Sequence, residues 1–195
     1  MAKQSVLFDE RFLDRHAGAI ISDTSVAIVE LVANAWDAYA TDVQITWPNL
    51  KDGIQFTITD NGRGMSAMQF EKRWRKLDYN RFAEEGSKVA PPAELKEFPP
   101  RQTYGRNGRG RHAAFRFSDP YIVRTWRDAT EVSYEVRRGT TQPFEIRLLK
   151  VEEGVRGHGT AIAATAPDAI IMSPQEAREV IGTRFLADPK LRRID

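Results

Sequence analysis

The 195-residue chain contains no cysteine, so disulfides, thiolate chemistry and cysteine-based zinc sites are excluded. Histidine is scarce, and His16, His112 and His158 show none of the spacings that bind a metal ion. No apolar run reaches the length of a membrane span, and the first residues lack a signal-peptide pattern. These absences predict a soluble, cytoplasmic protein that makes no contact with a membrane.

Internal repeats, low-complexity segments and the Gly-Lys-Ser/Thr triplet of a Walker A loop are also absent. The composition is that of an ordinary globular protein, 41% hydrophobic with a net charge of +2. Such a chain can bury one sizeable core, and so small a net charge is no evidence for a nucleic-acid partner. We therefore expect one domain that spans residues 1–195.

Hydrophobic periodicity and capping residues predict a mixture of helices and strands. Helices are expected at 23–40, 66–77 and 173–186, and strands at 43–47, at 54–60 and in the segments YIVRTW, EVSYEVRR, FEIRLLKV and GTAIAATA. Residues 1–22 are expected to form a short helix or an arm. Because most of the strands are joined as hairpins and are mixed with helices, the pattern indicates an α+β two-layer sandwich.

Residues 78–104 form a long polar segment with proline pairs at 91–92 and 99–100. Segments of this length without predicted structure are uncommon inside a compact domain, where they are usually lids or disordered. The segment lies directly before a glycine-rich loop. The residues alone leave both interpretations open.

The predicted helix at 23–40 carries a narrow polar stripe. At 100° per residue, Glu30, Asn34 and Asp37 fall within about 60° of one another and are flanked by apolar side chains. A solvated helix face is usually wider and richer in lysine and glutamate. Taken alone, the stripe still fits an amphipathic surface helix. Only the motifs that follow it can distinguish a solvated helix face from one that faces a ligand.

A second motif, ITDNGRGM, places Asp60 at the end of an apolar strand, before Gly62 and Gly64. A carboxylate at this point can accept a hydrogen bond from a ligand, while the glycines let that ligand approach the backbone closely. The same residues also fit a plain Asp-Asn-Gly turn. This motif alone does not decide between the two.

A glycine-rich loop opens a predicted short helix. It consists of Gly105, Arg106, Asn107, Gly108, Arg109, Gly110 and Arg111. Glycines before a helix N-terminus expose backbone N–H groups to an anion, and guanidinium groups match phosphate oxygens. A flexible loop with solvated arginines explains this stretch equally well when it is taken alone.

The order of the motifs is more specific than any one of them. Glu-x-x-x-Asn-x-x-Asp-Ala, Asp-x-Gly-x-Gly-Met, a lid-length segment and Gly-x-x-Gly-x-Gly are followed by a Gly-Thr pair before a strand. This arrangement, from about Asp23 to Ala166, resembles the GHKL ATPase superfamily, which includes DNA gyrase, the large cytosolic heat-shock chaperone, histidine kinases and MutL. MutL-like and MORC-like proteins look most similar. The resemblance implies a Bergerat fold, with helices on one face of a mixed, mostly antiparallel sheet and an ATP lid at 78–104.

The resemblance also implies a role for each matching residue. Glu30 would be the general base for the attacking water, and Asn34 would ligate Mg²⁺. Asp37 would border the nucleotide, and Asp60 would bind the adenine amine with support from Thr160. The remaining implied contacts are with the adenine base, from Gly62, Gly64 and Met65, and with the phosphates, from Gly105, Arg106, Asn107, Gly108, Arg109, Gly110 and Arg111.

The function implied by the resemblance is Mg-dependent binding and slow hydrolysis of ATP, with ADP as product. These steps would drive lid closure and ATP-dependent homodimerisation through the arm at 1–22. Dimeric members complete their site with a lysine from a second, C-terminal domain that this sequence does not contain. We therefore expect a nucleotide-binding fragment of a larger clamp-like machine, which would act on DNA through a partner or a missing domain.

Three alternatives remain open. A histidine kinase catalytic domain usually has Asn or His at the position of Glu30 and Lys or Arg near that of Asp37, so both residues oppose it. A nucleic-acid-binding module would need interleaved exposed aromatic residues or a recognisable binding motif, and the arginine-rich loop has neither. A nucleotide-binding regulatory module without turnover is distinguished only by measuring hydrolysis.

Overall fold

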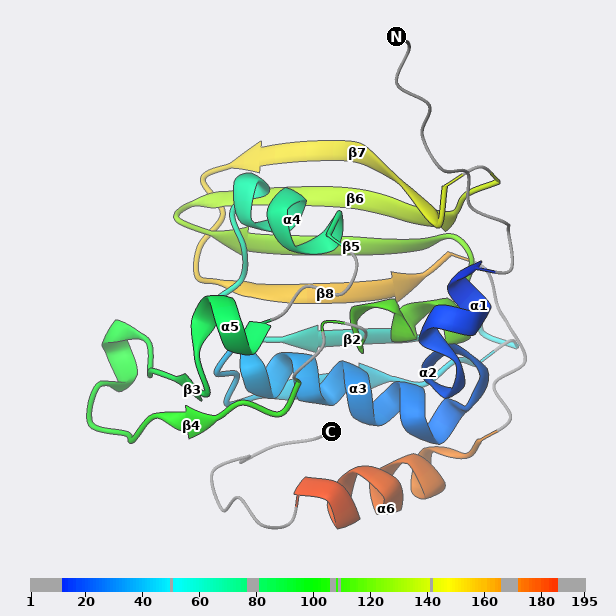
Figure 1. Cartoon of the computed structure of the whole chain (residues 1–195), viewed down its shortest axis with the longest axis horizontal. Helices are drawn as coiled ribbons and strands as arrows, with labels where there is room; N and C mark the ends of the chain where they lie inside the picture. The colour runs from blue at the N-terminus through cyan, green and yellow to red at the C-terminus, as the bar shows by residue number, and fades with distance from the viewer. Residues whose placement is uncertain are drawn as a thin grey trace, which may run out of the picture.

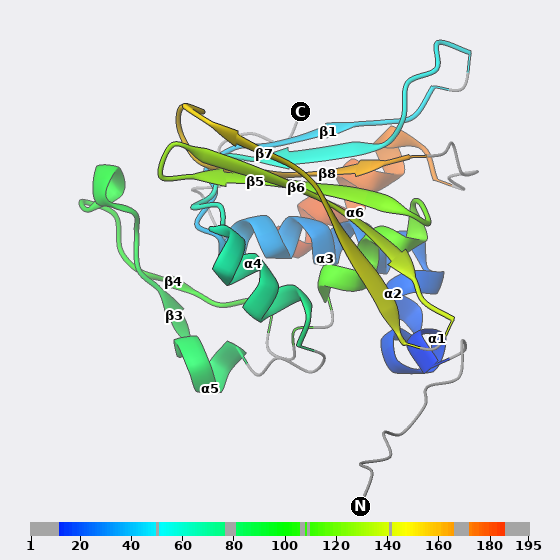
Figure 2. The ribbon, with the colours of Figure 1, turned by 90° about the horizontal axis from the view of Figure 1, so that it is seen from above.

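The computed structural model describes residues 12–49, 51–76, 81–105, 108, 110–140, 142–165 and 172–185. These residues form two layers, a six-stranded sheet and a layer of helices (Figure 1). Seen from above, the helices near the N-terminus lie together beneath one face of the sheet (Figure 2). This arrangement confirms the predicted α+β two-layer sandwich.

The sheet is antiparallel throughout its described strands. It contains β1 (Val43–Thr46), β2 (Thr57–Asp60), β5 (Tyr121–Arg127), β6 (Thr130–Arg138), β7 (Phe144–Glu153) and β8 (Gly159–Ala164). Their order is β1-β2-β8-β5-β6-β7. Because β8 lies between β2 and β5, the register places Asp60 opposite Thr160, although the two residues lie far apart in the chain.

The helical layer and the segment that projects from it complete the fold. They contain α1 (Phe12–Ala17), α2 (Ala19–Ser22), α3 (Thr24–Asp37), α4 (Ala67–Trp74), α5 (Arg81–Glu85), β3 (Lys88–Val89), the 3₁₀ helix η1 (Ala93–Leu95), β4 (Arg101–Gln102), the 3₁₀ helix η2 (Gly110–Arg116) and α6 (Pro174–Phe185). The helix predicted after the glycine-rich loop is thus a 3₁₀ helix. α6 packs beside α3 (Figure 1).

α3 begins where its capping residues predict. The Asp23 carboxylate accepts hydrogen bonds from the backbone N–H groups of Ser25 (2.7 Å) and Val26 (3.1 Å). On the face opposite the polar stripe, Ile28 and Val32 are both 0% exposed. Burial of this face in the core fixes the rotation of α3 about its axis, and with it the direction in which the stripe points.

α4 follows directly from the second motif. Ser66 and Gln69 form a reciprocal capping box at its start, in which each side chain accepts a hydrogen bond from the backbone N–H of the other. Phe70 is fully buried and stacks on Tyr134 of β6, with ring centroids 3.9 Å apart. This packing holds α4 against the sheet beside the end of the motif.

Helices form in both of the segments that the sequence described least clearly. Of the two alternatives for residues 1–22, the described part is helical: α2 packs on α3 and η2, α1 packs on α2 and η2, and Ala17 and Ile21 are buried in the core. Residues 81–104 contain α5, η1 and the β3–β4 hairpin, which projects to one side of the two layers (Figure 1). Residues 1–11 of the N-terminal segment, residue 77 of the predicted helix and residues 78–80 of the predicted lid lie outside the described residues. Within the described part of the chain, no helix has the length and apolar character needed to cross a bilayer.

Candidate functional site

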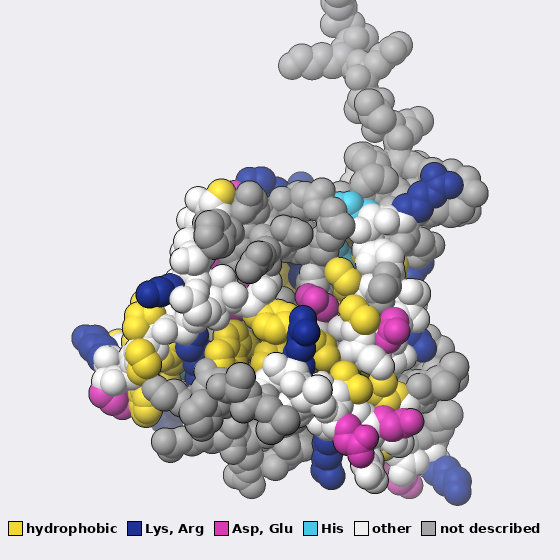
Figure 3. Space-filling model, turned by 60° about the horizontal axis from the view of Figure 1, so that its bottom comes forward, with side chains coloured by type: hydrophobic (Ala, Val, Ile, Leu, Met, Phe, Trp, Pro, Cys, Tyr) yellow, Lys and Arg dark blue, Asp and Glu magenta, His cyan; other side chains and the backbone are white. Residues whose placement is uncertain are grey.

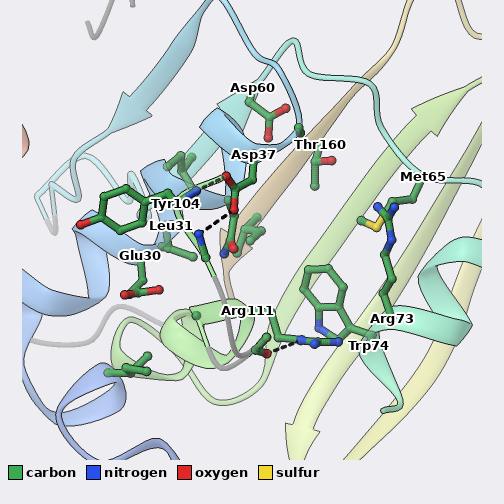
Figure 4. Close-up of a pocket in the computed structure, with 18 of the residues that line it drawn as sticks. Glu30, Leu31, Asp37, Asp60, Met65, Arg73, Trp74, Tyr104, Arg111 and Thr160 are labelled. Carbon is green, nitrogen blue, oxygen red and sulfur yellow. Dashed lines mark hydrogen bonds between the residues drawn. The ribbon is translucent and has the colours of Figure 1, made fainter. Parts of the chain in front are cut away.

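A cavity of about 500 Å³ opens between α3, α4, η2, α6 and the sheet strands β2 and β8. Figure 3 shows a hollow floored by hydrophobic side chains, and Figure 4 shows the residues that line the cavity. Clefts of this size bind cofactors and other small molecules. Most of the predicted site residues line it, namely Glu30, Asn34, Asp37, Asp60, Gly64, Met65, Gly105, Gly108, Gly110, Arg111 and Thr160. Gly62 does not line it, and Arg106, Asn107 and Arg109 lie outside the described residues.

Asp60 provides a carboxyl group at one end of the cavity (Figure 4). The group accepts hydrogen bonds from the backbone N–H groups of Gly62 (2.8 Å) and Thr160. Burial raises the pKa of Asp60 to about 7, although these two hydrogen bonds and the neighbouring His158 act in the opposite direction. A carboxylate here can still accept a hydrogen bond from a ligand, because each of its oxygens has two lone pairs.

Glu30 and Asn34 lie one turn apart on α3, and both are half-buried in the cavity wall. Burial raises the pKa of Glu30, and the carboxylate of Asp37 adds to the rise, whereas Arg184 opposes it. Among the described residues, the side-chain nitrogen of Asn34 is buried and has no hydrogen-bond partner. A buried amide without a partner is unfavourable, so a polar ligand in the cavity would satisfy it.

Asp37, the third residue of the stripe, is only 3% exposed. Its two carboxylate oxygens accept hydrogen bonds from the backbone N–H groups of Tyr104 (2.7 Å) and Gly105 (2.9 Å), as Figure 4 shows. Asp37 therefore lies in the cavity wall. It also joins α3 to the start of the glycine-rich loop, a contact that the sequence did not indicate.

The two glycines after Asp60 are required by the packing of the protein itself. A Cβ at Gly62 would lie 2.6 Å from the Cβ of Ala38 and 2.7 Å from Oδ1 of Asp60. Gly64 has a φ of +62°, and a Cβ there would collide with the carbonyl oxygen of Trp126. A glycine at position 62 thus makes room for Ala38, at the end of α3, and the contact of Gly62 with adenine stays a prediction.

Thr125 of β5 links two of the motifs and was missed by the sequence analysis. Its side chain is 0% exposed, and its hydroxyl accepts a hydrogen bond from the backbone N–H of Met65 (2.8 Å). The same hydroxyl donates to the carbonyl of Gly159 (3.1 Å) and lies 3.3 Å from the hydroxyl of Thr160. A threonine in a strand gives no signal of this kind in the sequence, because it is a common strand residue.

The glycine-rich loop meets α3 at Glu30. A Cβ at Gly110 would collide with the Glu30 carboxylate, so glycine is needed for that carboxylate to remain in place. Arg111, predicted to contact phosphate, is only 6% exposed, and its Nε donates a hydrogen bond to the carbonyl of Gly108 (2.6 Å). Its guanidinium group therefore supports the loop from within as well as lining the cavity (Figure 4).

Several lining residues were not predicted. They are Ile20, Leu31, Ala38, Ile58, Arg73, Trp74, Glu85, Tyr104, Ile162 and Arg184. The apolar members have the spacing of ordinary core residues, which hides their position at a cavity. Arg73 of α4 and Glu85 of α5 form an ion pair of 2.7 Å across the cavity wall, a contact between elements that no local pattern predicts.

The C-terminal end of the 81–104 segment is held on the end of α3. The guanidinium carbon of Arg101 lies 4.7 Å from the ring centroid of Trp36 and 4.2 Å from that of Tyr39. Arg101 also donates a hydrogen bond to the carbonyl of Ala40 (2.6 Å), and Trp36 Nε1 donates to the carbonyl of Gln102 (2.9 Å). This end of the segment is therefore tightly fixed.

A second contact holds η1, in the middle of the same segment, to His158 in the turn before β8. His158 Nε2 lies 2.5 Å from Oε1 of Glu94, and its Nδ1 lies 2.6 Å from the carbonyl oxygen of Gly62. Glu94 is exposed and His158 is partly exposed. The bond is therefore open to exchange with water, unlike the buried contacts of Arg101.

A metal ion would find few protein ligands here. The described residues contain no group of three or more His, Asp or Glu side chains able to hold an ion by themselves. Mg²⁺ is commonly bound through one or two protein groups together with phosphate oxygens and water. The side-chain carbonyl oxygen of Asn34 is of the kind that Mg²⁺ prefers, and its unsatisfied nitrogen is a donor that fits a phosphate oxygen.

Comparison of the sequence with models of protein families gives a match. A family model described as histidine kinase-, DNA gyrase B-, and HSP90-like ATPase matches residues 21–160. No curated protein matches the chain. The matched range runs from α2 to Thr160, so it contains the polar stripe, the Asp60 turn, the lid segment and the glycine-rich loop. The chain belongs to the family of histidine kinase-, DNA gyrase B- and HSP90-like ATPases.

Proposed function

We propose that this chain binds ATP together with Mg²⁺ in the cavity, hydrolyses the ATP slowly, and closes the 78–104 lid during the cycle. One observation carries the proposal. A single cavity brings together Asp60 and Thr160 from the sheet with Glu30 and Asn34 from α3, although the sequence presents them as separate motifs. ATP binding is also the general activity that membership of the family supports.

The geometry of α3 suggests the direction in which the nucleotide lies. The backbone N–H of Arg63 donates to the carbonyl of Ala38 (2.9 Å), so the Asp60 turn is attached at the C-terminal end of α3. Glu30 lies eight residues before Ala38, which corresponds to about 12 Å along the helix axis at 1.5 Å per residue. An adenine at Asp60 would therefore extend its phosphates toward Asn34 and Glu30.

The residues at the phosphate end suit phosphoryl transfer to water. This reaction depends on positioning and electrostatic stabilisation more than on covalent help. Glu30 would accept a proton from the attacking water, and its raised pKa brings it closer to the range in which a general base works best. Gly108 and Gly110 would present backbone N–H groups to the phosphates. Bound Mg²⁺, held by Asn34, would supply neutralisation of phosphate charge.

We expect binding to depend on Mg²⁺ and to favour adenine over guanine nucleotides. A carboxylate at position 60 accepts a hydrogen bond from the adenine amine, whereas guanine carries a carbonyl oxygen at that edge. Calorimetric titration of the chain with non-hydrolysable ATP and GTP analogues, with and without Mg²⁺, measures both effects. Equal affinity for the two analogues would contradict the role of Asp60. Binding of ATP without release of phosphate would instead identify a regulatory module without turnover.

The lid should respond to the triphosphate in only part of its length. We expect hydrogen exchange across residues 81–95 to slow when a non-hydrolysable ATP analogue binds, and to slow much less with ADP. Residues 101–105 should be protected in every state, because Arg101 and Asp37 already hold this end. Mass spectrometry of exchanged peptides provides the measurement. Identical protection of residues 81–95 in the free, ADP-bound and triphosphate-bound states would argue against a lid.

Lid closure would in turn drive homodimerisation of a larger clamp-like protein, which reaches DNA through a partner or a further domain. This part of the proposal rests on the resemblance to dimeric members of the superfamily, and family membership itself supports only the binding of nucleotide. Glu30, placed against the glycine-rich loop, is the reason for proposing transfer to water rather than to a histidine side chain.

A further inference from the structure

Arg184 is a cation at the cavity that neither the predicted motifs nor the proposed function uses. It lies in the last turn of α6 and lines the cavity together with Glu30. The next residue, Phe185, is 8% exposed, and its ring centroid lies 6.1 Å from that of Trp36 and 5.3 Å from that of Tyr104. Arg184 is therefore carried by a helix that is anchored against the rest of the site.

Tyr104 holds the guanidinium group of Arg184. Nε of Arg184 donates a hydrogen bond to the Tyr104 hydroxyl, and the guanidinium carbon lies 5.3 Å from the centroid of the tyrosine ring. The backbone N–H of Tyr104 is itself bonded to Asp37 (2.7 Å). Through these contacts the arginine is positioned relative to α3, the helix that carries Glu30 and Asn34.

Arg184 is the most exposed of the three arginines that line the cavity. Arg73 forms its 2.7 Å ion pair with Glu85, and Arg111 is buried, with its Nε bonded to the Gly108 carbonyl. Within the described part of the chain, no carboxylate lies within the 4.0 Å ion-pair distance of Arg184. An exposed guanidinium group held by a neutral hydroxyl can take an anionic partner without giving up a salt bridge.

The position of Arg184 corresponds to the phosphate end of the cavity. Its positive charge is close enough to Glu30 to act against the rise in the pKa of that residue. Glu30 in turn lies about 12 Å along α3 from the helix end at which the Asp60 turn is attached. A guanidinium group at this place faces the end of an extended triphosphate, and its planar donors match phosphate oxygens.

We propose that Arg184 binds the terminal phosphate of the nucleotide and so distinguishes a triphosphate from a monophosphate. The inference rests on the proposed function, because it assumes that ATP occupies the cavity with its adenine at Asp60. It adds a residue from α6, which lies outside the matched range of the family, to the site.

The test compares ligands as well as variants of the full chain. Arg184→Ala should bind a Mg-bound, non-hydrolysable ATP analogue about 10- to 100-fold more weakly than wild type, and AMP with unchanged affinity. Arg184→Lys should recover part of the loss, because it keeps the charge but not the planar donor pair. The matched control is Arg178→Ala, which removes an exposed arginine from the same helix outside the cavity and should leave both affinities unchanged.

The outcomes separate this inference from the proposed function. If wild type bound neither nucleotide, the proposed function and the role of Arg184 would both be rejected. If wild type bound the analogue and Arg184→Ala bound it equally well, only the inference would fail. An equal loss of affinity for AMP and for the triphosphate analogue would show that Arg184 merely supports Tyr104 and α6, and would also overturn the inference.

Discussion

Replacing Asp60 with asparagine should abolish adenine nucleotide binding and, at pH 8, make the unliganded protein more stable. The carbonyl oxygen of the asparagine amide would still accept a hydrogen bond from the N–H of Gly62. Its NH₂ group, a donor, would then face the adenine amine. Two donors would then face each other, and we expect a loss of affinity of about 10²-fold or more. Calorimetric titration with the ATP analogue measures this effect.

The gain in stability follows from the pKa of Asp60. Part of the side chain is open to the cavity, but protein surrounds the rest, and burial raises the pKa from 3.8 to about 7. The folded state therefore holds the proton more tightly than the unfolded state. The bound proton therefore adds to the free energy of unfolding. This contribution is complete below pH 3.8 and is lost as the pH rises through about 7.

Asparagine does not ionise, so Asp60→Asn should gain stability relative to wild type, by up to about 2–3 kcal/mol between pH 5 and pH 8. Urea unfolding at the two pH values tests this, with Asp52→Asn in the exposed β1–β2 turn as the matched control. A difference between wild type and Asp60→Asn that did not change with pH would refute the raised pKa. Binding of ATP by the variant with wild-type affinity would refute the adenine contact.

Replacing Glu30 with alanine should separate hydrolysis from binding. Glu30 acts on the water in the proposed reaction, so Glu30→Ala should keep most of its affinity for ATP and lose about 10²- to 10⁴-fold in turnover. Asn34→Ala should lose both, because Asn34 would hold the ion that bridges the phosphates. Calorimetry and a phosphate-release assay on each variant give the two quantities.

The matched control for Glu30 is Glu71→Ala, which removes an exposed carboxylate from α4 outside the cavity and should leave turnover unchanged. If Glu30→Ala hydrolysed ATP at the wild-type rate, Glu30 would be only a polar residue on a helix face. If Glu30→Ala remained folded but no longer bound ATP, Glu30 would contribute to the binding of ATP and not only to its hydrolysis.

The sequence by itself determined the local elements, and most of the residues that it singled out line one cavity. The capping residues Asp23 and Ser66 predicted where α3 and α4 begin, because a cap depends on bonds between near neighbours in the chain. The narrow stripe of Glu30, Asn34 and Asp37 was visible because helical periodicity is a local property. The order of the motifs then identified the family that the comparison confirms.

Only the tertiary structure decided how the motifs meet. Asp60 lies opposite Thr160 because β8 is inserted between β2 and β5, and strand order depends on the packing of the whole sheet. Asp37 receives its N–H donors from Tyr104 and Gly105, at the far end of the lid segment. Such partners leave no periodic signal, since their approach is set by the path of the chain between them.

The same reason explains the residues that the sequence did not single out. The close approach of Ala38 to Gly62 is a contact of this kind. Arg184 was not singled out, because nothing in α6 marks it until that helix packs beside α3 and brings it to Glu30. A sequence records what each residue can do chemically and which face of its own element it occupies. Which residues share a cavity is decided by contacts between elements, where burial of the core fixes the distances.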